Sequence, residues 1–399
     1  MEILTENQAI LAKGYQSTGV WCGIKRAKKD LALFFSEQSA SVAGVFTTNA
    51  VKGAPVLVCQ EHLAYGCGRA IVINSGNANT CTGPQGLADS RRMAQLAAEA
   101  LGVCTQEVFP VSTGVIGVPL PMDKIARGIS AAVDSLAAGQ LGDAAEAILT
   151  TDLRPKVISV GFGPDKRYTL TGIAKGSGMI HPNMATMLAF LLTDAPIGSA
   201  PLQSLLKEVT DETFNMISVD GDTSTNDTVL AFANGAAGGE PILLDSEVYA
   251  QLRAAFLAAC TYLAKEIARD GEGASKLITI EVRGARNRQE ARLAARSISR
   301  SNLVKTAIYG ADANWGRVLC AVGYSGIDLE LEKVKMSIGG LEVFAGGVPL
   351  PFDETCAREV LSQAEVTITV DLGVGSAGAT AYTCDFTEDY VKINASYRS

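Results

Sequence analysis

The segment Lys175-Gly-Ser-Gly-Met-Ile-His-Pro-Asn-Met-Ala-Thr-Met-Leu-Ala-Phe-Leu-Leu-Thr-Asp194 joins a glycine-rich turn to a stretch of apolar residues. Its two glycines and the Pro182-Asn183 pair favour tight turns and backbone angles that most residues avoid. The apolar run from Met187 to Leu192 has the length of a buried strand. Thr186 therefore stands where a bent loop enters the predicted core.

This position gives the threonine hydroxyl a chemical role if the chain is cut before it. Cleavage between Ala185 and Thr186 would leave a segment whose first residue is threonine. The α-amine of such a residue can serve as the general base for its own hydroxyl. An unperturbed α-amine has a pKa of about 7.7 to 8.0, which suits a base at neutral pH. By spacing alone, a glycine-rich turn before a core strand is the commoner interpretation.

The segment resembles the self-cleavage motif of the ornithine acetyltransferases, also called glutamate N-acetyltransferases. One departure is His181, at a place where alanine is as readily expected. Other segments resemble the same family, and they lie at 46–49, 74–79, 111–117, 150–152, 271–276, 304–312, 314–317, 381–385 and 394–399. The resemblance thus extends from residue 46 to residue 399.

The resemblance implies a fold, an assembly and a reaction. The fold would be α+β, with a layered αββα core of the N-terminal-nucleophile type and a second α/β lobe. Autocatalytic cleavage would divide the chain into segments 1–185 and 186–399, which fold together and pair as an α2β2 heterotetramer. The enzyme would transfer the acetyl group of N-acetylornithine to glutamate through an acetyl-threonine intermediate, in arginine biosynthesis.

The resemblance also implies the residues of the site. Thr186 would be the nucleophile, and Thr113 with the N–H of Gly114 would form the oxyanion hole. Lys175 and Glu272 would supply the opposite charges that a substrate with a carboxylate and an ammonium group needs. The implied substrate-binding positions are Thr150, with Thr151 as its neighbouring alternative, Lys175, Thr186, Glu272, Asn394 and Ser399. Without the resemblance, Thr113-Gly114 would be interpreted as a turn, and Lys175 and Glu272 as solvated charges. Asn394 and Ser399 would be interpreted as a frayed chain end.

Composition indicates a globular, acidic protein. A chain of 399 residues with 47% hydrophobic content can bury a large core. The net charge of -8 argues against a nucleic-acid surface, and the densest basic cluster, at residues 25–29, is expected to be solvated. No run of eighteen apolar residues is present, so no membrane span is expected.

Cysteine and histidine usage bears on location and cofactors. The nine cysteines are an odd number without Cys-x-x-Cys spacing, and the first residues are acidic, so we expect reduced thiols in a cytoplasmic protein. With two histidines, a metal site of His and Cys is not expected. The implied reaction needs no bound cofactor. The sequence does not decide whether acetyl-CoA is a second acetyl donor or whether arginine inhibits the enzyme.

Hydrophobic periodicity predicts alternating helices and strands. Helices are expected at 86–102, 121–139 and 246–267, the last with one continuous apolar face. Strands are expected at 55–59, 70–74, 156–161, 277–282, 318–322 and 366–371. No Pro/Ser-rich linker is present, so the cut before Thr186 is the only division that the sequence suggests.

Several other functions remain open. An N-terminal-threonine amidase or aminopeptidase would share the cut but pass the acyl group to water, whereas a non-enzymatic amino-acid-binding relative would keep an intact chain. A phosphoryl-transfer enzyme built on Lys175-Gly-Ser-Gly178 lacks the complete phosphate-binding loop. Gly373-Val-Gly-Ser-Ala-Gly378 fits a dinucleotide fingerprint, but too few residues follow it. The aspartates at 220, 222 and 227 lack EF-hand spacing and are expected to form a structural polar loop near the active site.

Overall fold

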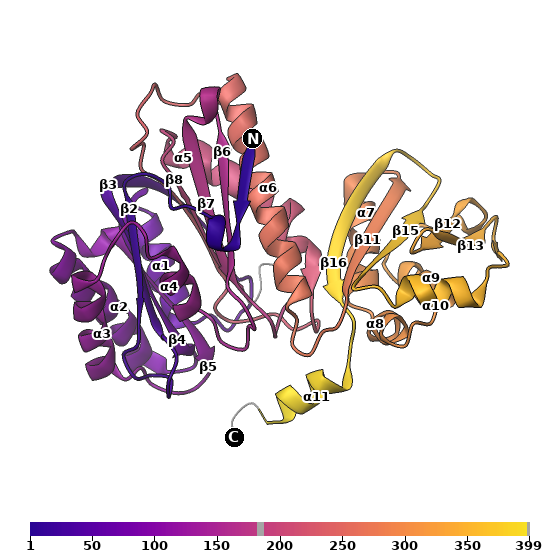
Figure 1. Ribbon diagram of the computed structural model, residues 1–399, viewed down its shortest axis with the longest axis horizontal. Helices are drawn as coiled ribbons and strands as arrows, with labels where there is room; N and C mark the ends of the chain where they lie inside the picture. The colour runs from indigo at the N-terminus through magenta and orange to yellow at the C-terminus, as the bar shows by residue number, and fades with distance from the viewer. Residues whose placement is uncertain (182–186, 397–399) are drawn as a thin grey trace. The chain divides into compact units, whose positions relative to one another are not determined.

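The computed structural model describes residues 1–181 and 187–396, which form two compact units (Figure 1). Unit 1 comprises Met1–Gly176, Asn183–Glu212 and Thr223–Leu263, and unit 2 comprises Ser177–Pro182, Thr213–Asp222 and Ala264–Ser399. The chain therefore passes between the units several times. Their boundaries differ from the division at 185/186, a processing boundary that stays a prediction.

Unit 1 is built on a nine-stranded sheet. Eight of its strands are paired in the order β1-β6-β7-β8-β10-β3-β4-β5, and the ninth, β2, also pairs with β3. The strands are β1 Glu2–Thr5, β2 Tyr15–Val20, β3 Leu31–Phe46, β4 Cys67–Asn77, β5 Val108–Val115, β6 Lys156–Phe162, β7 Tyr168–Lys175, β8 Leu188–Thr193 and β10 Thr228–Ala233. The helices that belong to it are α1 Ala54–Leu63, α2 Gly83–Leu101, α3 Met122–Asp134, α4 Leu141–Ala147, α5 Ser199–Glu212 and most of α6 Glu247–Arg269.

This sheet folds over at β3, so that its two halves face each other. The pairing of β3 with β4 is irregular between Phe35 and Ala40, where the long strand bends. The ring centroids of Phe34 on β3 and Phe190 on β8 lie 5.8 Å apart, although these strands are not neighbours in the sheet. Phe109 on β5 and Phe232 on β10 make a second such contact at 5.4 Å. The core therefore lies between two β layers.

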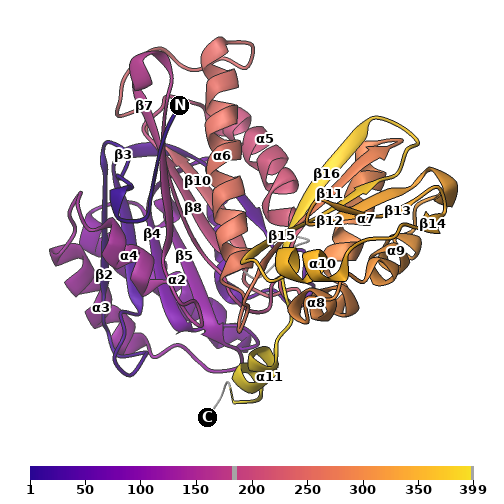
Figure 2. The ribbon, with the colours of Figure 1, turned by 45° about the vertical axis from the view of Figure 1, so that its right-hand side comes forward.

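Helices cover the outer faces of both layers. Alternate residues of β3 and β4, such as Leu31 and Val72, pack against α2 and α3 in a second core cluster. On the other layer, Leu263 of α6 lies over Gly172 of β7, and Figure 2 shows α5 and α6 along this side of β8 and β10. The order helix, sheet, sheet, helix confirms the predicted αββα core.

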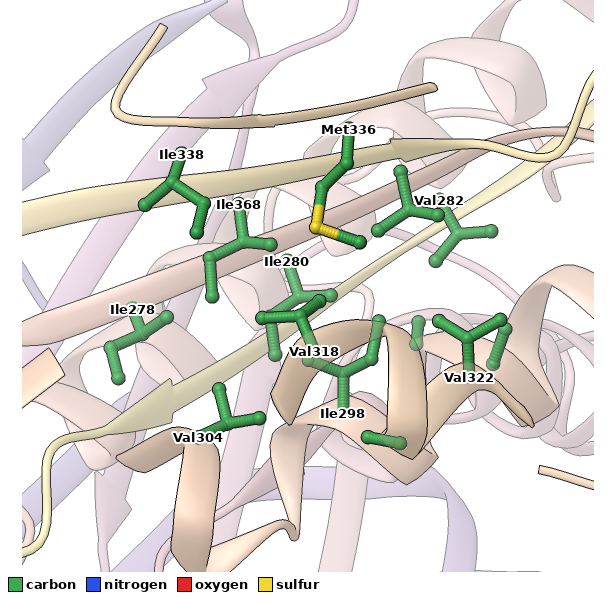
Figure 3. Packing of buried hydrophobic residues seen from close by; sticks show 14 of the residues in the cluster. Ile278, Ile280, Val282, Ile298, Val304, Val318, Val322, Met336, Ile338 and Ile368 are labelled. Carbon is green, nitrogen blue, oxygen red and sulfur yellow. The ribbon is translucent and has the colours of Figure 1, made fainter. Parts of the chain in front are cut away.

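Unit 2 contains a sheet with the strand order β14-β13-β12-β15-β11-β16-β9. Its strands are β9 Ile217–Ser218, β11 Leu277–Ala285, β12 Lys335–Ile338, β13 Leu341–Ala345, β14 Val348–Pro349, β15 Glu365–Asp371 and β16 Ala377–Cys384. Its helices are α7 Arg288–Ser299, α8 Asn302–Tyr309, α9 Trp315–Gly323, α10 Glu354–Leu361 and α11 Glu388–Ala395. Ile278 and Ile280 of β11 pack on Ile298 of α7 and Val318 of α9 (Figure 3). This is the second α/β lobe that was predicted.

Two of the predicted strands are wrong. Residues 55–59 lie in α1, where Pro55 occupies the first helical turn, a position at which proline needs no hydrogen-bonded N–H. Residues 318–322 lie in α9, whose first turn is capped by the Asn314 side chain accepting from the N–H of Arg317. Both runs are short, apolar and partly β-branched, so periodicity alone does not separate strand from helix.

The other predicted elements are confirmed. The helices at 86–102 and 246–267 correspond to α2 and α6, whereas the helix at 121–139 ends earlier, at Asp134. The strands at 70–74, 156–161, 277–282 and 366–371, and the apolar run at 187–192, correspond to β4, β6, β11, β15 and β8. None of the helices within residues 1–181 and 187–396 is long and apolar enough to cross a membrane.

Candidate active site

The predicted cleavage segment connects two neighbouring antiparallel strands of unit 1. Lys175, the last residue of β7, pairs with Leu188, the first residue of β8. Ala185 and Thr186 lie between them and, like Ser399, are outside the described residues. The surroundings of the cut are therefore defined by the residues on either side of it.

On the downstream side, Met187 is held by the start of β10. Its backbone N–H donates to Oδ1 of Asp227 at 2.7 Å, and its carbonyl accepts from the N–H of Thr228 at 3.2 Å. The Asp227 side chain is buried, and its Oδ2 has no hydrogen-bond partner in the described part of the chain. Burial raises the pKa of Asp227 well above its usual range and so favours the neutral form of this carboxyl group.

The candidate oxyanion residues lie near the end of β5, where it runs parallel to β4. Gly114 has a φ of +134° and pairs with Gly76, and a Cβ at position 114 would overlap the backbone of Gly76 and Asn77. Only glycine fits this close approach of two chains. Thr113, directly before it, is buried with 8% of its surface exposed.

Asn226 connects these residues to the start of β10. Its Nδ2 donates to the carbonyls of Ser112 at 2.9 Å and of Ala78 at 2.6 Å, and its Oδ1 accepts from Oγ1 of Thr80 at 2.6 Å. Asn226 and Asp227 are consecutive in the chain. Asn226 binds β5 next to Thr113 and Gly114, and Asp227 binds the N–H of Met187. Neither residue is among the site residues predicted from the sequence, although Asp227 is expected in a structural polar loop near the active site.

A buried charge cluster lies on the upstream side of the segment. Nζ of Lys175 donates to Oγ1 of Thr150 at 2.8 Å and lies 3.7 Å from Oδ2 of Asp152. Asp152 Oδ1 also accepts from Nζ of Lys156 at 2.8 Å and from the N–H of Gly176 at 2.6 Å. The Lys175 side chain is 4% exposed and that of Asp152 is 0% exposed, so Lys175 is a buried cation and not a solvated charge.

The ionisation of Asp152 follows from these neighbours. Burial alone would raise the pKa of its carboxyl group, but the ammonium groups of Lys175 and Lys156 and the N–H of Gly176 hold that pKa well below its usual range. Asp152 is therefore a carboxylate at all ordinary pH values. Asp152 lies within the segment 150–152 that carries the resemblance, but the sequence predicts no role for it.

Unit 2 brings together the predicted residues Glu272 and Asn394. Nδ2 of Asn394, on α11, donates to Oε2 of Glu272 at 2.8 Å, and Glu272 is buried with 8% exposed. The Glu272 N–H donates to the carbonyl of Ser177 at 3.0 Å, and a Cβ at Gly178 would overlap the Glu272 carboxyl group. The turn at 177–178 therefore leaves room for the Glu272 carboxyl group only because residue 178 is glycine.

Asp220 holds the next two residues of the same turn. Its carboxyl oxygens accept from the N–H groups of Met179 at 2.6 Å and Ile180 at 2.8 Å, and Oδ2 also lies 3.3 Å from the hydroxyl of Tyr390. Burial raises the pKa of Asp220. This role as an acceptor for backbone N–H groups agrees with the structural polar loop expected from the sequence.

Comparison with known proteins identifies relatives over the whole chain. The family model described as the ArgJ family matches residues 16–399. The arginine biosynthesis bifunctional protein ArgJ of Caldanaerobacter subterraneus subsp. tengcongensis is 50% identical over 404 residues and is covered completely, as is this chain.

Two crystal structures of relatives each match about half of the chain. That of the arginine biosynthesis bifunctional protein argJ from Bacillus halodurans is 49% identical with a TM-score of 0.51, and it covers 52% of this chain and 97% of its own. That of the ornithine acetyltransferase from Mycobacterium tuberculosis, complexed with ornithine, is 40% identical with a TM-score of 0.43, and it covers 45% of this chain and 97% of its own.

Proposed function

Because this chain belongs to the ArgJ family, we propose that it is an acyltransferase of arginine biosynthesis that moves the acetyl group of N-acetylornithine to glutamate. Maturation begins when Oγ1 of Thr186 attacks the carbonyl carbon of Ala185. The bond from that carbon to the Thr186 nitrogen breaks, the hydroxyl proton passes to this nitrogen, and an ester remains. Water then hydrolyses the ester, and segment 186–399 begins with Thr186.

Turnover is a double displacement on the same hydroxyl. The α-amine of Thr186 takes the hydroxyl proton while Oγ1 attacks the acetyl carbonyl, and the Thr113 hydroxyl and Gly114 N–H stabilise the oxyanion. The proton passes to the leaving nitrogen, ornithine departs, and an acetyl-threonine ester remains. The amine of glutamate attacks this ester, N-acetylglutamate is released, and the Thr186 hydroxyl regains its proton.

The hydrogen bonds of the consecutive residues Asn226 and Asp227 carry this proposal. They hold the strand end bearing Thr113 and Gly114 and the residue that follows Thr186 to one short stretch of chain. Such preorganisation is what an oxyanion hole and its nucleophile require. The coverage of the Bacillus halodurans structure also supports cleavage, because half of this chain accounts for nearly all of that crystallised chain.

Substrate binding is proposed for the two charged pairs. Lys175 with Thr150 would bind the α-carboxylate, which a buried ammonium and a hydroxyl suit. Glu272 with Asn394 would bind the side-chain ammonium of ornithine, and Ser399 would complete this set. We further propose a cytoplasmic α2β2 assembly that needs no metal or bound cofactor. Acetyl-CoA would be a second donor, in keeping with the word bifunctional in the names of the relatives.

The intact mass of purified protein under denaturing conditions tests the nucleophile. The wild type should give two fragments, the larger beginning at Thr186, whereas Thr186→Ala should remain one chain of 41.7 kDa. Thr186→Ser, which keeps a hydroxyl, is the matched control and should still be cut. An uncut wild-type chain in a folded, active preparation would refute the mechanism and favour the amino-acid-binding alternative. Cleaved enzyme that releases acetate instead of N-acetylglutamate would favour the amidase.

A further inference from the structure

Lys25 does not lie on the solvated basic surface that the sequence predicts for residues 25–29. Arg26 and Lys28 are exposed, but Lys25 is partly buried in a loop of unit 1. The loop is held by the fully buried Asp30, whose carboxylate accepts from the N–H groups of Cys22 at 2.6 Å, Gly23 at 3.1 Å and Lys25 at 2.9 Å. The position of Lys25 is therefore built into the fold.

The stem of Lys25 passes beside the candidate oxyanion hole. A Cβ at Gly76 would lie 3.3 Å from Cγ and 3.9 Å from Cε of Lys25. Gly76 has a φ of +99° and is the residue that pairs with Gly114. The lysine stem thus runs beside Gly76, whose backbone approaches Gly114.

The ammonium group of Lys25 ends beside the proposed carboxylate-binding pair. Its Nζ donates to the carbonyl of Leu149 at 2.6 Å and to that of Lys29 at 3.1 Å. Leu149 directly precedes Thr150, whose hydroxyl accepts from Nζ of Lys175 at 2.8 Å. Two lysine ammonium groups therefore bind consecutive residues of one segment. An ammonium group has three N–H donors, and these contacts of Lys25 use two of them.

The charges around Lys25 favour an anionic ligand. Asp30, Asp152, Lys28 and Lys175 are the charged groups that act on it. Both carboxylates are already engaged, Asp30 by three backbone N–H groups and Asp152 by Lys156, by Lys175 and by two backbone N–H groups. Burial, as the largest influence, lowers the pKa of Lys25 to about 8, so the group is still mainly charged at neutral pH. The positive charge of Lys25 and its neighbouring lysines is therefore not fully neutralised by these two carboxylates.

We propose that Lys25 binds the side-chain carboxylate of the acetyl acceptor, beside the α-carboxylate bound by Lys175. This inference rests on the proposed function. Glutamate carries two carboxylates, whereas N-acetylornithine carries one and has an ammonium group at its other end. Both substrates can share Lys175, but only the acceptor needs a second cation. Lys25 is therefore a specificity-determining residue for the acceptor.

The test compares glutamate with glutamine, which has the same shape but no side-chain charge, as acceptors for wild type and Lys25→Gln. Losing one charge-assisted hydrogen bond should reduce the preference for glutamate about 10- to 100-fold through KM. The KM for N-acetylornithine should stay within about twofold. Lys124→Gln is the matched control, because Nζ of Lys124 also donates to this loop, at the Gly23 carbonyl (2.6 Å), but is exposed.

The pH profile adds a readout that a structural role would not change. Above about pH 8 Lys25 loses its charge, so the wild-type preference for glutamate over glutamine should decline as pH rises. Lys25→Arg should keep the preference at higher pH, since a guanidinium stays protonated. Equal KM increases for both substrates, or an unchanged glutamate-to-glutamine ratio in Lys25→Gln, would overturn the assignment.

Ornithine release in the absence of acceptor separates this result from failure of the proposed function. If wild type, Lys25→Gln and Lys124→Gln all release ornithine equally, the acetyl-threonine step is intact and the acceptor comparison stands. If wild type transfers no acetyl group, the proposed function fails. Calorimetric binding of L-glutamate and L-glutamine to wild type and Lys25→Gln then tests the role of Lys25 in acceptor binding. A loss of affinity for L-glutamate alone would support this role, and an equal loss of affinity for both ligands would refute it.

Discussion

Replacing Asp152 with asparagine tests whether the buried charge cluster stabilises unit 1. The amide keeps the shape and can still accept from the N–H of Gly176, but Lys156 and Lys175 lose their carboxylate partner. The Lys156 and Lys175 side chains are 1% and 4% exposed, so water does not replace that partner. Breaking a buried ion pair from one side costs about 3 to 5 kcal/mol, and we expect Asp152→Asn to lower the unfolding free energy by this amount.

Urea unfolding followed by tryptophan fluorescence measures the change in unit 1. The chain has two tryptophans, Trp21 in unit 1 and Trp315 in unit 2, so Trp21 reports alone in a Trp315→Phe background. The matched control is Glu208→Gln, the same chemical change in an ion pair with Arg253 whose side chains are 43% and 39% exposed. This exposed pair should contribute less than about 1 kcal/mol.

The expected pH dependence follows from the lowered pKa of Asp152. A carboxyl group whose pKa is lower in the folded chain adds stability above its unfolded pKa of about 3.9, and that stability is lost as pH falls through the folded value. The difference between wild type and Asp152→Asn should therefore shrink below about pH 4. A cost at pH 7 no larger than that of Glu208→Gln would refute the reasoning. So would a failure of Lys156→Met to restore stability in the Asp152→Asn background.

The buried carboxyl of Asp227 and the close approach of Gly114 each give one further prediction. Because the pKa of Asp227 is raised in the folded chain, its contribution to stability is fully present below about pH 3.9 and is lost as pH rises. Asp227→Asn should remove this decline. A thermal unfolding temperature that falls equally between pH 4.5 and 8 in wild type and Asp227→Asn would contradict the prediction. Gly114→Ala should lower kcat by about 100-fold or more by displacing the proposed oxyanion donor. Gly102 also has a positive φ, +69°, but a Cβ there would meet open space, so Gly102→Ala should lose stability only. Equal kcat values for the two variants would contradict the role of Gly114.

The elements that the sequence predicts well are those with a long or regular pattern. The apolar face of α6 repeats over 23 residues, and β6, β11 and β15 are β-branched runs between turn residues. The failures at 55–59 and 318–322 are five-residue runs, in which a buried helix and a buried strand look alike. What separates them is local, the proline in the first turn of α1 and the Asn314 cap of α9.

For the candidate site, the sequence supplies charged and reactive residues but not their supports. Asn226 acts by hydrogen bonds to Ser112 and Ala78, which precede it by 114 and 148 residues, and no local pattern encodes such contacts. Lys25 illustrates the opposite error. Its basic neighbours suggest a solvated run, yet the buried Asp30 turns this one lysine toward Leu149. A paired carboxylate for the buried Lys175 could have been anticipated, since buried ammonium groups are almost always paired.

Three carboxyl groups accept from backbone N–H groups on the two sides of the proposed cut. Asp152 binds Gly176, Asp220 binds Met179 and Ile180, and Asp227 binds Met187, and each contact lies within one unit. Carboxyl oxygens suit this task because a turn leaves N–H groups without strand or helix partners. Self-cleavage gains from chain ends that are held before the hydroxyl attacks, since less freedom is then lost on reaching the reactive geometry.

The same residue type meets two different electrostatic conditions at these positions. Asp152 faces two lysines and stays ionised, so its bond to Gly176 is charge-assisted at any pH at which the protein is folded. Asp227 is buried, and burial raises the pKa of its carboxyl group, which accepts from the N–H of Met187 directly after the proposed cut. Rising pH therefore places a new charge in a buried setting at Asp227 downstream and at Asp220 upstream, while Asp152 stays ionised throughout. The pH sensitivity of cleavage should accordingly follow Asp227 and Asp220 and not Asp152.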